Sequence, residues 1–123
     1  MCEPIRVAAV VVALLLGIHV APSSVAFAFR GAPATVRAAY TSAPLVSCGS
    51  GLPVPLRGVH LVVHFRPARS ATAVRRLPGT GPVLGLAKTC DFESDLAWAV
   101  GLDRRRPYDV VRSKGRVAVV FRG

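Results

Sequence analysis

The stretch of sequence that decides the fold reads Val59-His60-Leu61-Val62-Val63-His64-Phe65-Arg66. Its odd-numbered positions are all apolar, whereas its even-numbered positions mix apolar with polar side chains. A period of two, built from β-branched and aromatic residues, is typical of a β-strand with one face in a core. We therefore expect residues 59–66 to form a strand that turns its odd-numbered side chains inward.

Other short apolar runs flank this stretch, and Gly, Pro and Ser residues separate them. The predicted strands are residues 25–30, 35–40, 83–89, 92–100, 108–112 and 116–122. Ser113-Lys114-Gly115 predicts a hairpin turn between the last two strands. Residues 67–82 are polar and rich in Arg, so we expect a long exposed loop there, with room for one helical turn at 71–77. Six or seven strands at this spacing predict an all-β fold, a single small β-sandwich or open-barrel-like domain.

The first 23 residues are typical of a secretory signal peptide. Arg6 precedes a compact apolar run over residues 7–18, shorter than the ~20 residues that a stable transmembrane helix needs. Small residues permit cleavage between positions 21 and 28, and we favour a site near 21–24 because a cut after Ala28 would destroy the strand expected at 25–30. The sequence therefore predicts a secreted or envelope-associated protein, with a signal segment at 1–23, one β-domain at 24–123 and no stable transmembrane span.

Two cysteines would remain after removal of the signal segment, Cys48 and Cys90. An exported chain with an even number of cysteines can form a disulfide, but two free thiols in separate loops are the alternative, and no spacing pattern decides between them. Neither cysteine belongs to a paired Cys or His motif, so the sequence predicts no metal site.

The charge is strongly positive, with 16 Lys and Arg against 6 Asp and Glu and a formal net charge of +10. Such a chain should attract polyanions such as nucleic acid, anionic lipid or acidic wall polymers. Alternatively, Arg is simply frequent in proteins from GC-rich genomes. Export argues against a nucleic-acid partner, and so does the lack of aromatic residues interleaved with basic ones.

The densest cluster of charge is Arg104-Arg105-Arg106, with Asp103 before it and Pro107-Tyr108 after it. Three guanidinium groups on a loop between strands could bind carboxylates or phosphates in bidentate fashion. The alternative is a solvated turn in which Asp103 caps its own backbone. Tyr108 follows the turn and is a candidate for stacking on a ligand, whereas Trp98 is expected in the core.

No catalytic set emerges from the remaining polar residues. His60 and His64 share one strand face, but at ~3.3 Å per residue they stand about 13 Å apart, too far to bind one metal ion. Asp91, Glu93 and Asp95 also share one expected strand face, without the glycine of a calcium loop, and a solvated strand edge is favoured. We expect a protein that is not an enzyme and that needs no cofactor.

Residues 91–108 combine an acidic and aromatic segment, a strand, Gly101-Leu102-Asp103 and an Arg/Pro/aromatic turn. This arrangement resembles the AMIN-like domain of exported proteins and lipoproteins in GC-rich bacteria. Residues 49–58, the strand that follows and Phe65-Arg66-Pro67-Ala68 resemble it too, and residues 25–31 lie where its first strand would lie. The chain departs from the family where Ser113-Lys114-Gly115-Arg116 replaces a Pro-Pro-Arg turn and where the closing strand lacks Asp.

The resemblance implies a β-sandwich-like domain outside the membrane. Through a more distant similarity to the amidase-associated AMIN domain, it also implies binding to peptidoglycan or wall glycan. The expected partner is thus a cell-wall polymer or another anionic envelope component, with the contact at residues 103–108. The alternatives are a basic polyanion-binding protein and a truncated remnant of the family without a defined activity.

Overall fold

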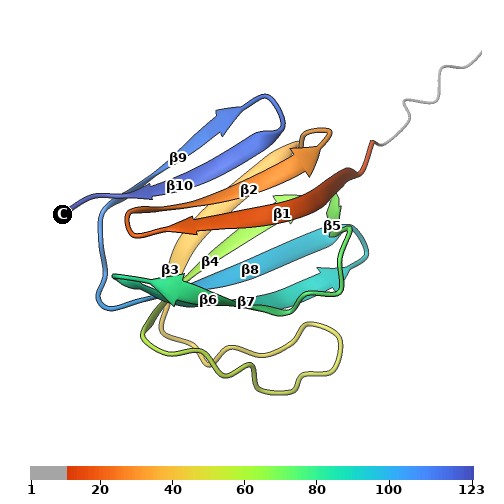
Figure 1. Cartoon of the computed structure of the whole chain (residues 1–123). Coiled ribbons are helices and arrows are strands. Elements are labelled where there is room, and N and C mark those ends of the chain that lie inside the picture. The colour runs from red at the N-terminus through yellow and green to blue at the C-terminus, as the bar shows by residue number, and fades with distance from the viewer. Residues whose placement is uncertain (1–10) are drawn as a thin grey trace, which may run out of the picture.

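This computed structural model describes residues 11–123, and this part of the chain contains ten β-strands (Figure 1). The strands are β1 (Ala13–Ala21), β2 (Ser24–Arg30), β3 (Thr35–Thr41), β4 (Val59–Arg66), β5 (Ala68–Ser70), β6 (Arg76–Thr80), β7 (Val83–Phe92), β8 (Asp95–Leu102), β9 (Tyr108–Ser113) and β10 (Arg116–Phe121).

The strands form two five-stranded sheets that pack face to face (Figure 1). The first sheet has the order β5-β1-β2-β10-β9, and the second has the order β3-β4-β8-β7-β6. Neighbouring strands are antiparallel except for β1 and β5, which are parallel. Because the sheets stay separate, the fold is a β-sandwich, which confirms the all-β prediction.

The core lies between the inner faces of the two sheets. Phe65 of β4 contacts Phe27 and Phe29 of β2, with ring centroids 4.8 and 4.9 Å apart. Trp98 of β8 is only 1% exposed, so the expectation that it belongs to the core is confirmed. The odd-numbered side chains of β4 point inward as the alternating sequence predicts, with Leu61 and Phe65 fully buried.

The prediction of a long loop at residues 67–82 is wrong, because β5 and β6 lie there. Both strands are short and form the outer edges of their sheets, β5 beside β1 and β6 beside β7. An edge strand has one side in solvent, so it accepts charged residues and proline. Pro78 in β6 illustrates why the sequence of this segment does not look like a strand.

The strand expected at 92–100 also needs correction. Phe92 ends β7, and the chain reverses at Glu93 and Ser94, whose φ angles are +50° and +63°. Consequently β8 begins at Asp95, and Asp91 lies on the neighbouring strand. The three acidic residues do not share one strand face as expected. The turn predicted before β10 is present, with Gly115 at a φ of +69°.

Strand β1 lies amino-terminal to the domain boundary expected at residue 24. It pairs with β2 along its length and with β5 at its start, and it buries Ala13 and Leu15. The apolar run that resembles a signal peptide therefore continues into a strand of the first sheet, while residues 1–10 lie outside the described part. Removal of the segment, and export of the chain, stay predictions.

Candidate functional site

The residues 103–108, called the basic loop below, follow a tightly packed end of β8. A Cβ atom on Gly101 would collide with the carbonyl oxygen of Arg57, so only glycine fits beneath the segment that precedes β4. The next residue, Leu102, is fully buried in the core. These contacts explain the Gly-Leu-Asp sequence. Gly101 leaves room for the segment at Arg57, Leu102 packs in the core, and Asp103 begins the loop.

An ion pair within the basic loop fixes its shape. Arg106 donates from Nε and Nη2 to the two carboxylate oxygens of Asp103, at 3.0 and 2.9 Å. This hydrogen bonding holds the pKa of Asp103 below its usual range and raises the pKa of Arg106. Arg106 also donates to the carbonyl oxygen of Gly123, and its side chain is only 15% exposed. Its role in this structure is therefore to hold the loop.

Tyr40 of β3, the edge strand of the sheet that contains β8, supports the same loop. Its hydroxyl donates to the carbonyl oxygen of Arg106 at 2.7 Å and accepts from the backbone N–H of Arg106 at 2.9 Å. Tyr108 donates to the carbonyl oxygen of Ala38 at 2.8 Å, and its ring packs edge-on against Tyr40 at 5.7 Å. The half-buried Tyr108 thus bridges the two sheets, and Tyr40 is a site residue that the sequence did not predict.

Arg104 and Arg105 are the exposed cations of the basic loop. The guanidinium carbon of Arg105 lies 5.3 Å from the centre of the Tyr40 ring, within the range of a cation–π interaction. Arg104 donates to the carbonyl oxygen of Gly123 and otherwise faces solvent. The structure therefore divides the arginine cluster into one inward residue and two that an anion could reach.

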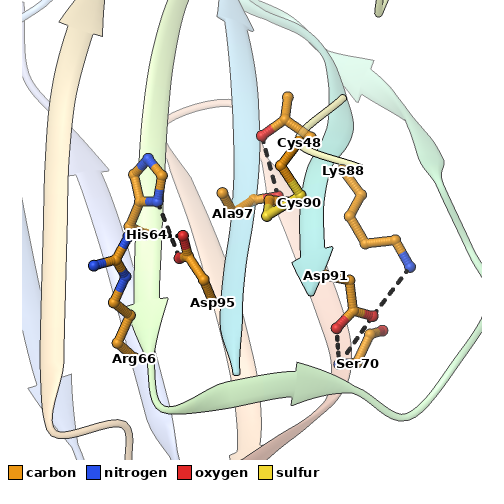
Figure 2. Close-up of a disulfide and its surroundings, with 10 residues drawn as sticks. Cys48, His64, Arg66, Ser70, Lys88, Cys90, Asp91, Asp95 and Ala97 are labelled. Atoms are coloured by element: carbon orange, nitrogen blue, oxygen red, sulfur yellow. Dashed lines mark hydrogen bonds and ion pairs between the residues drawn. A yellow bond between two sulfur atoms is a disulfide. The ribbon is translucent and has the colours of Figure 1, made fainter. Parts of the chain in front are cut away.

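A second polar cluster lies on the outer face of the second sheet (Figure 2). Asp95 accepts from Arg66 at 2.8 Å and lies 3.2 Å from Nδ1 of His64. The pKa of Asp95 is lowered, first by the hydrogen bond from Arg66 and then by the contact with His64. An open groove of about 590 Å³ lies beside the cluster, and Arg37 contributes to its lining. This cluster was not predicted, because Asp95 was expected inside a strand at 92–100, whereas it begins β8 beside Arg66 at the end of β4.

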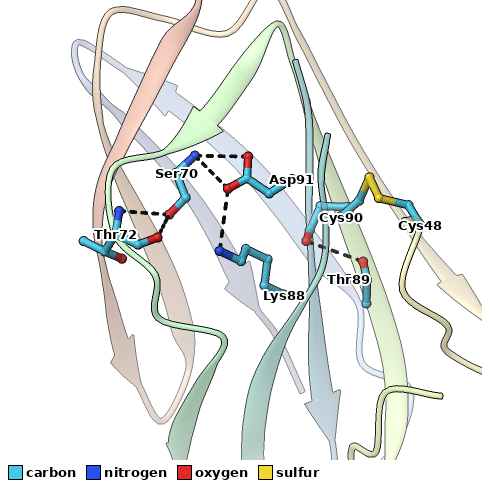
Figure 3. Close-up of polar contacts among 8 residues, drawn as sticks. Cys48, Ser70, Thr72, Lys88, Thr89, Cys90 and Asp91 are labelled. Carbon is cyan, nitrogen blue, oxygen red and sulfur yellow. Dashed lines mark hydrogen bonds and ion pairs between the residues drawn. A yellow bond between two sulfur atoms is a disulfide. The ribbon is translucent and has the colours of Figure 1, made fainter. Parts of the chain in front are cut away.

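A disulfide joins Cys48 to Cys90, across 42 positions of sequence (Figure 2). It fastens the long segment between β3 and β4 to the outer face of β7, where Cys48 also donates from its backbone to the carbonyl oxygen of Thr89 at 3.0 Å. Figure 3 shows Lys88 and Ser70 converging on Asp91 next to this bond. Two distant parts of the chain therefore meet around the end of β7.

A groove of about 810 Å³ opens beside the disulfide. It is called the disulfide groove below, and its lining comes from the segments 47–54, 72–76 and 88–92, without Gly51 and Val74. No pattern in the sequence indicates this groove, because its walls are the loop 47–54 and the segment 72–76, which the disulfide and the β6–β7 pairing hold beside the end of β7.

Positive charge remains in excess over the described surface. Each aspartate there has a basic partner: Lys88 with Asp91, Arg66 with Asp95, Arg106 with Asp103, and Arg122 with Asp109. Most arginines form no ion pair within residues 11–123, namely Arg30, Arg37, Arg57, Arg69, Arg75, Arg76, Arg104, Arg105, Arg112 and Arg116. A polyanion would meet these groups uncompensated.

Two negative observations apply to residues 11–123. No group of three or more His, Cys, Asp and Glu side chains in that range is placed to hold a metal ion. None of these residues forms a helix with the length and apolar character to cross a membrane.

The fold and its surface define a small all-β sandwich domain with many uncompensated arginines. A family model described as the AMIN-like domain matches residues 9–121, so the chain belongs to the AMIN-like domain family and the resemblance is confirmed. Membership indicates a domain related to the cell envelope. No curated protein and no solved structure matches the chain.

Proposed function

We propose that this AMIN-like domain acts outside the cytoplasmic membrane as a non-enzymatic module that binds an anionic polymer of the cell envelope, either peptidoglycan or a wall glycan. The basic loop makes the contact. The observation that carries the proposal is the split within the arginine cluster, in which Arg106 is held inward while Arg104 and Arg105 stay exposed.

Fixing the loop beforehand favours binding. The Asp103–Arg106 pair and the two hydrogen bonds between Arg106 and Tyr40 hold the backbone before a ligand arrives, so less conformational entropy is lost on association. Arg104 and Arg105 then offer planar donors that match carboxylate or phosphate oxygens. In this proposal Arg106 is a positioning residue, and the contact belongs to its two neighbours.

The test is cosedimentation of the full chain with purified peptidoglycan sacculi across a salt series. The variant R104A/R105A removes the two exposed charges and leaves the Asp103–Arg106 pair in place. The variant R30A/R116A is the matched control, because it removes the same charge from the outer face of the first sheet. We expect the full chain and the control to remain bound at moderate salt and R104A/R105A to be released.

Two results would contradict the proposal. If both double variants lose binding equally, and salt releases every form, bulk charge alone accounts for retention and the chain is a polyanion-binding protein. If incubation with sacculi releases soluble saccharide that a buffer control does not, the domain is an enzyme.

A further inference from the structure

We propose that the disulfide groove is a second binding site and that its ligand is an acidic saccharide, a sugar that carries carboxylate or phosphate groups. The inference rests on the proposed function for its biological setting, but it concerns different residues. The groove is lined by Phe92 at the end of β7. The basic loop follows β8, which runs antiparallel to β7, so it leaves the opposite end of that sheet (Figure 1).

The walls of the groove are fixed at several points. The first wall is the loop 47–54, which the disulfide from Cys48 joins to Cys90. Within this loop the backbone N–H of Ser47 donates to the carbonyl oxygen of Leu52 at 2.9 Å. The second wall is the segment 72–76, which is held to β7 because the backbone N–H of Lys88 donates to the carbonyl oxygen of Arg75 at 2.9 Å. A volume of about 810 Å³ falls within the range of sites for small ligands.

The groove selects for negative charge. Arg75 and Arg76 line it, both are exposed, and neither has an acidic partner within the described part of the chain. Asp91 is the single acidic residue in the lining, and it is already engaged by Lys88 at 3.6 Å and by the backbone N–H of Ser70 at 3.4 Å (Figure 3). The arginines are therefore available to the carboxylate or phosphate of a ligand.

The rim of the groove favours a sugar over other anions. Phe92 is 59% exposed because the turn at Glu93 and Ser94 leaves its ring outside the core, and Leu52, which also lines the groove, is 65% exposed. An exposed aromatic ring can cover the apolar face of a sugar, while hydroxyl groups such as that of Thr72 reach its oxygens. A single aromatic ring is a poor platform for nucleic acid, which stacks successive bases on several rings.

The experiment maps binding by proton–nitrogen correlation NMR on the full chain, with hexagalacturonate as the acidic probe. The neutral chitohexaose and a single-stranded oligothymidylate are the comparison probes. We expect hexagalacturonate to shift the signals of residues 47–54, 72–76 and 88–92. The variant R75A/R76A should raise its Kd about tenfold, as loss of charge-assisted hydrogen bonds from exposed groups predicts, and Phe92→Ala should raise it about fivefold.

The variant R30A/R116A should leave this Kd within about twofold, since both residues lie outside the groove. The proposal falls if R30A/R116A weakens binding as much as R75A/R76A does, if chitohexaose binds as tightly as the acidic probe, or if the oligothymidylate binds the groove more tightly. Failure here leaves the cosedimentation result of R104A/R105A untouched, so the two sites stand or fall separately. All substituted residues are exposed, and a melting curve for each variant confirms that it is folded.

Discussion

Because β1 pairs with β2 and contributes to the core, we predict that a chain that begins at Ser24 will not fold cooperatively. Four side chains of β1 face the core, with Ala13 and Leu15 buried and Ile18 and Val20 packed against its edge. Full burial of one large aliphatic side chain contributes about 1.5–3 kcal/mol, so β1 supplies on the order of 5 kcal/mol. That amount is comparable to the whole stability of a small domain, about 5–15 kcal/mol.

The assay is urea denaturation of the full chain and of the chain that begins at Ser24. Trp98 is the sole tryptophan and is 1% exposed, so its fluorescence reports unfolding. In the full chain, Leu15→Ala should lower the free energy of unfolding by about 2–5 kcal/mol, since Leu15 is 2% exposed. Leu16→Ala is the matched control, because Leu16 is 45% exposed and its loss should change the free energy by less than about 0.5 kcal/mol.

One result would refute the reasoning. If the chain that begins at Ser24 unfolds cooperatively with the midpoint of the full chain, β1 is dispensable and its packing contributes nothing. A signal segment ending at residue 23 would then be compatible with a stable mature domain. If the shorter chain instead shows the spectrum of an unfolded protein, a cleavage that removes all of β1 is incompatible with this fold.

Three further predictions concern single contacts. Replacing Cys48 and Cys90 by Ser should lower the free energy of unfolding in urea by about 4 kcal/mol, the loop-closure entropy for a separation of 42 residues. A reductant should lower the free energy of unfolding of the parent chain by the same amount and leave that of the Ser variant unchanged. Gly101→Ala should lower the melting temperature because its Cβ meets the carbonyl oxygen of the covering segment, whereas Gly49→Ala, which meets nothing within 4 Å, should not; equal effects would contradict the packing argument. The folded pKa of Asp95 is depressed, so its stabilising effect is present above its unfolded pKa of about 3.9 and is lost as pH falls through the folded value. Asp95→Asn should therefore weaken the fall in the free energy of unfolding below about pH 4. If this fall is unchanged in the variant, the role of the Arg66 contact is refuted.

The sequence predicted strands well wherever one face is buried and the other is polar. Residues 59–66 show this alternation, and they form β4 with the predicted face inward. The closing hairpin was also predictable, because Gly115 supplies the positive φ that its turn requires. Edge strands β5 and β6 were missed, since a strand with solvent on one side keeps charged residues and proline and loses the pattern.

The amino-terminal run shows a different limit. A short apolar run has no periodicity that separates a buried strand from the core of a signal peptide. The neighbouring strands determine which structure forms, because the hydrogen bonds that make residues 13–21 a strand come from β2 and β5. Likewise the reversal at Glu93 and Ser94 places non-glycine residues at positive φ, for which no simple sequence pattern exists.

The candidate sites differ in how far sequence could reveal them. The basic loop is contiguous, so its charge is visible in the sequence, but only Tyr40 and Asp103 show that Arg106 is held inward while its neighbours are free. The disulfide groove is assembled from three separate segments, and no local pattern marks it. Both sites follow from one physical arrangement: aspartates are few and each is paired locally, so the unpaired arginines define where this domain can meet an anion. Binding strength should therefore depend on which exposed arginines a ligand can reach together, rather than on the net charge of the chain.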